Sequence, residues 1–307
     1  MTLHRLRGIA ALGIVAVTLL TGCSPQDAGP DRPSPSAIAG AQDAARSEAA
    51  QRTLGDLEKK YDATLGVYAL DTKSGREIAY HQDERFAYAS TSKALLAGAI
   101  LAQATDAELD ATVSYSSEDL VSYSPVLEAH VSDGLPLREV VAAAVRKSDN
   151  TAANLLFREL GGASAFEERL RALGDDTTDV ARTEPALNEA VPGDIRDTST
   201  PRALAHALRS YTLGNALSPE RRTLLIDDMT GNATGDPLIR AGVPAEWTVA
   251  DKSGAAAYGT RNDIAIVQIP TRDPIVMVIM SRRSEPDAAY DNSLVADAAR
   301  ALAAAFA

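Results

Sequence analysis

Hydrophobic and polar positions follow a strand pattern in two groups near the ends of the chain. Residues 63–68 and 77–81 form the first group, and the turn-forming residues 71–75 separate them. Residues 247–252, 263–269 and 275–281 form the second. Alternation with a period of two, as in the first group, is typical of β-strands, and the strand pattern returns in the mostly apolar second group, so we expect strands in two segments that lie far apart in the sequence. A helical pattern precedes the first group at residues 46–61 and follows the second at 292–306.

Helical spacing dominates between the two groups, from about residue 88 to residue 232. We expect helices over residues 90–105, 137–147, 151–160, 163–173, 201–211 and 219–229. Thr200-Pro201 and Ser218-Pro219 begin the last two, because a capping side chain followed by proline is typical of a helix start. The pattern predicts an α+β protein in which the N- and C-terminal segments build one sheet, flanked by helices, around an inserted all-helical domain.

This arrangement sets the expected domain boundaries. We place an α/β domain at residues 46–86 and 231–307 and an all-helical domain at 87–230, with the natural ligand site in the crevice between them. Residues 182–200 lack periodicity and contain Pro185, Pro192 and Gly193. Long loops of this kind in compact domains are usually functional.

The first 45 residues are expected to lie outside the folded part. Residues 1–23 have the pattern of a signal peptide, with Arg5 and Arg7 before an apolar run at 9–20 that is too short to span a bilayer comfortably. Leu20-Thr21-Gly22-Cys23 looks like a bacterial lipobox, in which the cysteine becomes lipidated; the alternative is an ordinary secretory leader. Residues 24–45 carry several prolines and little apolar content, which predicts a disordered tether.

We therefore expect an exported protein, either anchored to the outer face of the bacterial cell membrane by lipidated Cys23 or secreted. Of the 307 residues, 45% are hydrophobic and 23% charged, as in ordinary globular proteins. The formal net charge of −12 argues against nucleic acid as a partner. Because Cys23 is the only cysteine, the folded part has no disulfide and no thiolate chemistry.

Three short strings could carry chemistry. In Ser90-Thr91-Ser92-Lys93 the hydroxyl and the amine can meet one helical turn apart, and a desolvated lysine can take a serine proton. Ser148-Asp149-Asn150 lies on a turn between two predicted helices, where it could relay protons and bind a ligand. Lys252-Ser253-Gly254 lies on an apolar strand and could hold a carboxylate, with the glycine leaving the strand edge open. Taken singly, each string is better explained as capping or turn chemistry, as in the copy Lys73-Ser74-Gly75.

In this order, the three strings resemble the motif set of class A β-lactamases and penicillin-binding proteins. The resemblance to a class A serine β-lactamase extends from residue 46 to the end of the chain and implies a β-lactamase/D,D-peptidase-like fold with an antiparallel sheet. Tyr123-Ser124-Pro125 matches the family's aromatic at the site mouth, and residues 151–156 continue the second motif as family members do. Residues 182–200 match the family's omega loop, with Arg182 and Asp197 placed for the ion pair that closes it.

The resemblance also implies roles. Ser90 would attack the lactam carbonyl, the backbone N–H groups of Ser90 and Ala255 would form the oxyanion hole, and Ser148 would protonate the departing nitrogen. Glu184 with Asn188 would activate the deacylating water, while the acylation base, Lys93 or Glu184, stays open. The residues implied in substrate binding are Tyr123, Asn150, Asn188, Lys252, Ser253, Gly254 and Arg261, the last standing where many members keep a second carboxylate-binding cation.

Some positions depart from the family pattern. Ser253 stands where many relatives have threonine, and Ala89, Ala255, Ala256 and Ala257 replace residues that are often larger or more polar, so the substrate range is open. The sequence has no G-x-S-x-G elbow, no H-E-x-x-H string and no nucleotide motif, so we expect neither a metal nor a cofactor. We expect a monomer acting on a small β-lactam. The alternatives are a D,D-peptidase or penicillin-binding protein, and a silent envelope lipoprotein that binds β-lactam or peptidoglycan.

Overall fold

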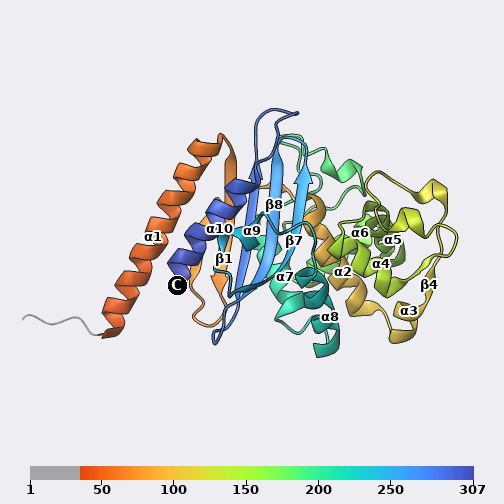
Figure 1. Ribbon diagram of the computed structural model, residues 1–307, viewed down its shortest axis with the longest axis horizontal. Helices are drawn as coiled ribbons and strands as arrows, with labels where there is room; N and C mark the ends of the chain where they lie inside the picture. Colours follow the sequence, from red (N-terminus) through yellow and green to blue (C-terminus); the bar gives the residue numbers. More distant parts are fainter. Residues whose placement is uncertain (1–34) are drawn as a thin grey trace, which may run out of the picture. The chain divides into compact units, whose positions relative to one another are not determined.

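The computed structural model describes residues 35–307 (Figure 1). The predicted signal peptide with Cys23, and the first part of the predicted tether, lie outside the described residues. Residues Ala41–Ala307 form one compact unit, in which the two predicted domains are packed together. No helix in the described part of the chain is long and apolar enough to cross a bilayer.

A five-stranded antiparallel sheet forms the centre of this unit, in the order β2-β1-β9-β8-β7. The N-terminal segment contributes β1 (Thr64–Asp71) and β2 (Glu77–Tyr80), and the C-terminal segment contributes β7 (Thr248–Ala256), β8 (Thr260–Gln268) and β9 (Ile275–Arg282). The two segments meet where β1 pairs with β9, from Thr64 opposite Arg282 to Asp71 opposite Ile275. The expected α+β fold, with a sheet built from both ends of the chain, is confirmed.

The β7–β8 hairpin is longer than the sequence pattern predicted. Tyr258 and Gly259 both have positive φ, 55° and 58°, and the Thr260 N–H donates to the Ala257 carbonyl at 3.2 Å. Two consecutive positive φ angles in a two-residue loop match the right-handed twist of the flanking strands. The hairpin therefore continues past Lys252 to Ala256, which brings Ala255 opposite Arg261.

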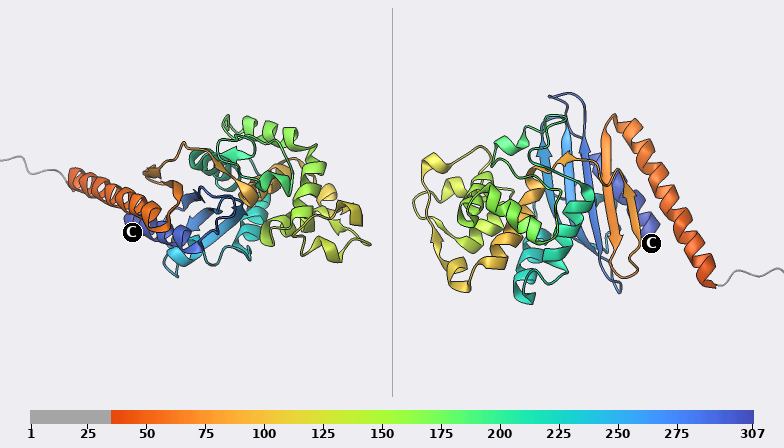
Figure 2. Two further views of the ribbon diagram at one scale, coloured as in Figure 1. Left: turned by 90° about the horizontal axis from the view of Figure 1, so that it is seen from above. Right: turned by 180° about the vertical axis from the view of Figure 1, so that it is seen from behind.

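Both faces of the sheet are buried. On β9, Met277 and Ile279 pack against α1 (Pro35–Tyr61) and α10 (Asn292–Phe306), while the alternate residues Val276 and Val278 face the other core. Figures 1 and 2 show α1 and α10 on one side of the sheet and the remaining long helices on the other. Burial of both faces explains why β9 is a nearly continuous apolar run.

Helix α1 begins at Pro35, not at residue 46, so the predicted tether of 24–45 is too long. Residues 36–45 contain no further proline and are rich in alanine, the best helix former. Proline is tolerated at the first helical position because its missing N–H has no helical partner there. The tether prediction gave too much weight to the prolines and too little to the alanines that follow them.

The middle of the chain is helical, as expected. Its longer helices are α2 (Ser92–Gln103), α4 (Leu137–Arg146), α5 (Asn150–Leu160), α6 (Ala163–Ala172), α7 (Pro201–Thr212) and α8 (Pro219–Thr230). Short elements that the pattern did not predict are α3 (Asp106–Asp110), α9 (Ile239–Gly242), the strand pairs β3 (Phe86–Ala87) with β6 (Thr198–Ser199) and β4 (Thr112–Val113) with β5 (Leu135–Pro136), and the 3-10 turns η1 (Ala89–Thr91), η2 (Ser117–Asp119), η3 (Leu127–Ala129) and η4 (Ala186–Asn188).

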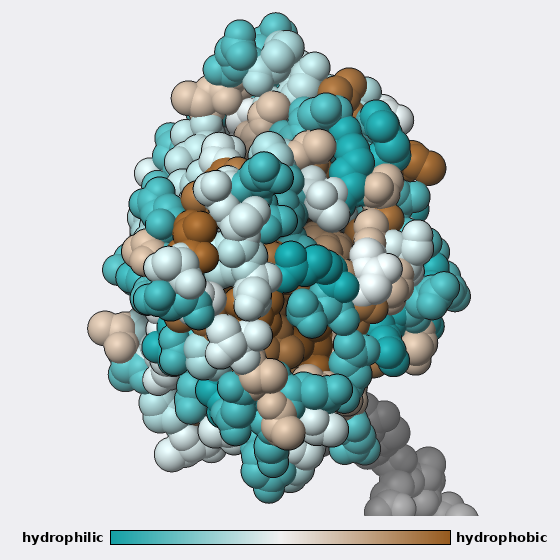
Figure 3. All heavy atoms as spheres, turned by 90° about the vertical axis from the view of Figure 1, so that its right-hand side faces the viewer, coloured by the Kyte–Doolittle hydropathy of each residue, from teal (hydrophilic) through white to brown (hydrophobic). Residues whose placement is uncertain are grey.

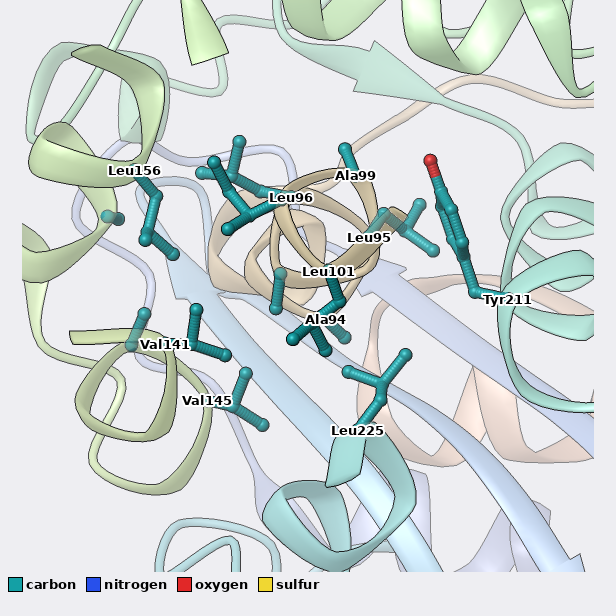
Figure 4. Packing of buried hydrophobic residues seen from close by; sticks show 14 of the residues in the cluster. Ala94, Leu95, Leu96, Ala99, Leu101, Val141, Val145, Leu156, Tyr211 and Leu225 are labelled. Carbon is teal, nitrogen blue, oxygen red and sulfur yellow. The ribbon is translucent and has the colours of Figure 1, made fainter. Parts of the chain in front are cut away.

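Helix α2 is the buried axis of this region. Every residue from Ser92 to Leu101 is buried, and Figure 4 shows its side chains surrounded by residues of α4, α5, α7 and α8. Gly98 lies so close to Tyr211 that an added Cβ would stand 2.6 Å from the ring. The outer face of the helical region is mainly polar, with small separate apolar patches (Figure 3). A helix held on all sides gives the residues at its N-terminal end a fixed position.

Candidate active site

Ser90 lies in the 3-10 turn η1, immediately before α2, rather than in the first turn of α2 itself. Ala89 before it has a left-handed φ of 50°, and the Thr91 hydroxyl donates to the Tyr88 carbonyl at 2.6 Å. A non-glycine residue in this region is uncommon and is held only where its surroundings fix it. The turn presents the Ser90 hydroxyl to a cleft at the edge of the sheet.

Lys93 follows one turn later, and its side chain is only 1% exposed. Its Nζ lies 2.9 Å from Glu184 Oε1 and donates to the Ser148 carbonyl at 2.8 Å. Within residues 35–307 the Ser90 hydroxyl donates to Glu184 Oε1 at 3.4 Å and makes no hydrogen bond with Lys93. The expected serine–lysine contact is therefore replaced by a carboxylate that touches both groups. Burial lowers the pKa of Lys93, and the Glu184 carboxylate opposes that shift.

The Ser148-Asp149-Asn150 turn both caps a helix and lines the cleft. Asp149 caps α5 by accepting from Ala152 N–H at 2.8 Å, and its other oxygen accepts from the backbone of Val126 and Leu127. Asn150 donates to the Ser122 carbonyl at 2.9 Å, which ties the turn to the segment carrying Tyr123. The string therefore caps a helix, as one interpretation expected, and also lines the cleft, as the other interpretation requires.

Ser148 lies between two lysines. It has a left-handed φ of 56°, and its Oγ is 3.1 Å from Lys252 Nζ and 3.5 Å from Lys93 Nζ. Lys252 is completely buried on β7 and also donates to the Ser253 carbonyl at 2.8 Å. Burial, together with the nearby Lys93 ammonium, lowers the pKa of Lys252 to about 7.

Gly254 has a packing role that the sequence did not indicate. A Cβ at this position would lie 3.1 Å from the Thr91 nitrogen and from the Tyr88 carbonyl oxygen. Strand β7 therefore approaches η1 as closely as it does because residue 254 has no side chain. This contact places Ala255 and Ser90 on the same cleft.

The loop at 182–200 is closed by the expected ion pair, in which Arg182 Nε lies 2.5 Å from Asp197 Oδ2. Asp197 Oδ1 also accepts from the Tyr88 hydroxyl at 3.0 Å and from the backbone N–H groups of Ala181 and Arg182. These bonds attach the loop to the segment that leads into Ser90. Glu184 is held at the loop's inner side, with Asn188 Nδ2 donating to Glu184 Oε2 at 2.5 Å.

Asn154 is a positioning residue that the sequence analysis did not assign. Its amide donates to the Glu184 carbonyl and accepts from the Glu184 N–H, both at 2.9 Å. It stands four residues after Asn150 on α5, so both side chains lie on one helix face. That spacing is the signal from which Asn154 could have been found.

The cleft has a volume of about 520 Å³. Tyr123 and Tyr290, 60% and 48% exposed, are its aromatic residues. Arg261 is buried at its side, donating to Asn292 Oδ1 at 2.8 Å with its guanidinium carbon 4.9 Å from the Tyr290 ring centre. Lining residues that the sequence analysis missed are Ala233, Thr234, Pro237 and Tyr290, and those it predicted are Ser90, Tyr123, Ser148, Asn150, Asn188, Ser253, Gly254, Ala255 and Arg261.

The arrangement can support acyl transfer. A serine hydroxyl lies beside a carboxylate, a second serine lies between two cations, and an amide shares the carboxylate from the other side. The same three features are the parts needed for nucleophilic attack, leaving-group protonation and water activation.

Known proteins share both the sequence and the fold. The sequence model of the β-lactamase enzyme family matches residues 49–306. A β-lactamase of Bacillus amyloliquefaciens is 57% identical over 244 residues, 80% of each chain. The β-lactamase ROB-1 of Haemophilus influenzae is 49% identical over 290 residues, 94% of this chain and 95% of its own.

Among solved structures, the class A β-lactamase from Clostridium kluyveri DSM 555 superposes with a TM-score of 0.82 at 49% identity, covering 83% of this chain and 98% of its own. The class A β-lactamase described as the last common ancestor of Gram-negative bacteria also gives 0.82, at 48% identity, covering 84% and 100%. The family model spans nearly all of the folded part of the chain, including the three short strings and the loop at 182–200. The chain belongs to the β-lactamase enzyme family and is a class A serine β-lactamase, which hydrolyses the β-lactam ring through a serine acyl-enzyme.

Proposed function

We propose that Ser90 is the nucleophile and that Glu184 takes its proton. The observation that carries this assignment is the position of Glu184 Oε1, 3.4 Å from Ser90 Oγ and 2.9 Å from Lys93 Nζ. Because Lys93 Nζ is paired with this carboxylate and makes no hydrogen bond with Ser90 within the described residues, the carboxylate is the acceptor in reach of the hydroxyl. Ser90 Oγ attacks the lactam carbonyl carbon while its proton moves to Glu184, and the ring C–N bond then breaks.

Ser148 is positioned to protonate the departing nitrogen. Its hydroxyl lies within 3.1 Å of Lys252 Nζ, and this cation favours release of the serine proton toward the nitrogen. Lys93 would then return a proton to Ser148 through their 3.5 Å contact and take up the proton that Glu184 received from Ser90, which leaves Glu184 ionised for deacylation. The backbone N–H groups of Ser90 and Ala255 would stabilise the negative carbonyl oxygen, each donor contributing about 2.7–4 kcal/mol.

The cleft wall formed by β7 and the start of β8 suits an anionic substrate. Lys252, Ser253 and Arg261 would bind the carboxylate that penicillins and cephalosporins carry, and Gly254 lets this wall approach the nucleophile. On the opposite wall, Asn150 would bind the side-chain amide of the substrate, and Tyr123 would cover it.

Deacylation distinguishes a lactamase from a penicillin-binding protein, which retains its acyl-enzyme. Glu184 and Asn188 share a hydrogen bond beside Ser90, so one water could be held by both and deprotonated by the carboxylate. A peptidase that retains its acyl-enzyme, or a silent binder, would not need Glu184 and Asn188 to hold a deacylating water, so this pair favours the lactamase over both alternatives.

Replacing Glu184 by glutamine should slow ester hydrolysis more than ester formation. Without the Glu184 carboxylate nothing opposes the lowering of the Lys93 pKa by burial, so the neutral Lys93 amine can take the Ser90 proton in its place, whereas the deacylating water loses its base. General base catalysis contributes about 10²–10⁴-fold, so we expect kcat for benzylpenicillin to fall by that factor. Intact-mass spectrometry of Glu184→Gln should show the enzyme heavier by one whole antibiotic, long after the wild type has cleared. Ser90→Ala is the control and should show no adduct. Wild-type turnover by Glu184→Gln would remove Glu184 from the mechanism.

We further propose that the protein is exported, lipidated at Cys23 and active as a monomer, or secreted where lipidation fails. The basic residues, the apolar run at 9–20 and Leu20-Thr21-Gly22-Cys23 support export and lipid attachment. One lipid chain holds a protein only weakly, whereas two anchor it stably. Such an anchor would keep the enzyme where β-lactams reach the cell envelope.

A further inference from the structure

Thr234 is a cleft residue whose hydroxyl lies 2.7 Å from that of Ser253. It belongs to the irregular segment between α8 and α9, opposite β7. Beneath this pair lie two fully buried polar residues, Asn232 and Asp251. The four side chains form one hydrogen-bonded chain that runs from the cleft into the protein.

The buried end of the chain fixes the orientation of the Asn232 amide. Asn232 Oδ1 accepts from the Thr234 backbone N–H at 3.1 Å, and a backbone N–H can only donate. The amide nitrogen must therefore face Asp251, whose Oδ2 lies 2.5 Å away. Arg240 Nε, 2.6 Å from Asp251 Oδ1, holds the carboxylate on its other side.

This orientation determines where the two hydroxyl protons point. Thr234 Oγ1 is 2.8 Å from Asn232 Oδ1, and an amide oxygen can only accept, so the threonine proton is donated to it. A hydroxyl has a single proton, and Thr234 has therefore none left for Ser253. The 2.7 Å contact requires Ser253 to be the donor and Thr234 the acceptor.

We propose that Thr234 is a positioning residue that holds the Ser253 proton away from the substrate. In the free enzyme Ser253 presents only lone pairs to the cleft, and these repel a carboxylate. To bind an anionic substrate, Ser253 must break its bond to Thr234 and turn its proton toward the substrate. Thr234 thereby weakens ground-state binding of the carboxylate, an effect that rests on the proposed role of Ser253 in binding it.

The test measures binding without chemistry, in a Ser90→Ala background that cannot be acylated. Calorimetry with benzylpenicillin should give a Kd about two- to tenfold lower for Thr234→Val, the range that one neutral hydrogen bond corresponds to. Thr234→Ser keeps the hydroxyl and should bind like the parent. The side chain of Thr234 is partly exposed, and Asn232 Oδ1 retains the Thr234 N–H as a donor, so Thr234→Val should fold normally.

Ser253→Ala separates this inference from the role on which it rests. It should raise the Kd, and adding Thr234→Val to it should produce no further change, because the proton in question is gone. If Ser253→Ala binds like the parent, the carboxylate role fails and the inference fails with it. If Ser253→Ala weakens binding while Thr234→Val leaves it equal or weaker, the role stands and the inference about Thr234 is overturned. Benzylpenicillin methyl ester, which lacks the anion, should be insensitive to Thr234→Val.

Discussion

At the scale of residues, the unusual feature is that two buried lysines, Lys93 and Lys252, both contact the hydroxyl of Ser148. Burying an ammonium costs free energy unless partners compensate for the lost water. Lys93 has the Glu184 carboxylate at 2.9 Å, whereas the hydrogen-bond partners of Lys252 Nζ among residues 35–307 are the neutral oxygens of Ser148 and Ser253. This difference explains why Lys252 is the lysine whose pKa falls to about 7, while Glu184 opposes the fall at Lys93.

The low pKa of Lys252 predicts an alkaline limit on catalysis. As the pH rises through about 7, Lys252 loses its proton and with it the charge that attracts the substrate carboxylate, so kcat/KM for benzylpenicillin should fall. Lys252→Arg keeps its charge over this range and should lose the alkaline limb, even if its kcat/KM is lower throughout. The pH profile of kcat/KM for both enzymes is the measurement. If the pH profile of kcat/KM for Lys252→Arg keeps the same alkaline fall as the wild type, the group that titrates is not Lys252.

Stability offers a check on Lys252 that is independent of activity. Its pKa is lower in the folded than in the unfolded protein, so the unfolded chain binds more protons between about pH 7 and the ordinary lysine value. The contribution of Lys252 to the free energy of unfolding therefore rises with pH across that range. Urea unfolding at about pH 7 and about pH 9 should show a smaller rise for Lys252→Met than for the wild type.

Site residues could be predicted from the sequence where a short local motif indicates their role. Ser90, Ser148 and Lys252 were identified from three short strings in a fixed order, and all three lie on the cleft or contact a residue that does. Thr234 and Asn154 were not assigned, because their roles depend on hydrogen bonds with Ser253 and Glu184, which are distant in the sequence. A threonine in a turn and an asparagine on a helix are too common to indicate such contacts by themselves.

At the scale of elements, the loop at 182–200 depends on its neighbours for its shape. Asp197 attaches it to Tyr88, and Asn154 attaches Glu184 to α5. Its position was predictable from its missing periodicity, but its attachment to α5 was not. Likewise, the strand pattern placed β7 correctly but ended it at residue 252, because the Tyr258-Gly259 turn has no common hairpin sequence.

Asn154→Ala should loosen Glu184 without touching the substrate cleft directly. Losing two hydrogen bonds to the Glu184 backbone should destabilise the protein by about 1–3 kcal/mol. Because Glu184 is the proposed deacylation base, kcat should fall more than the affinity for substrate, and the acyl-enzyme should accumulate in rapid-quench experiments. Arg158→Ala on the same helix, whose side chain bonds to the Ser114 carbonyl instead, is the matched control. Equal effects of the two variants on kcat would argue against a specific role for Asn154.

At the scale of the whole molecule, the folded unit and the proposed anchor are separate in the sequence. The catalytic cleft belongs to residues 90–290, and the proposed lipidation site is Cys23. The anchor should therefore determine location and leave catalysis unchanged.

Cys23→Ala, expressed in a bacterial host, should move the enzyme from the membrane fraction to the soluble one. Dual acylation anchors a protein stably, so its loss should shift most of the activity. The control is the specific activity per molecule of enzyme, which should match the wild type in both fractions. Equal amounts of Cys23→Ala and wild type in the membrane fraction would rule out lipid anchoring at Cys23.

The pairing of β1 with β9 also affects when the protein can fold during its synthesis. Thr64 is made early and Arg282 late, yet they are partners in the central sheet. Contacts this far apart in the sequence form slowly, because a long stretch of chain must be ordered before they can close. During synthesis, Ser90 leaves the ribosome early. Strand β7, which completes the cleft around Ser90, is made much later and only then finds its partner β8. A nascent chain should accordingly stay open, unable to react with an antibiotic and still able to be threaded through a translocation pore.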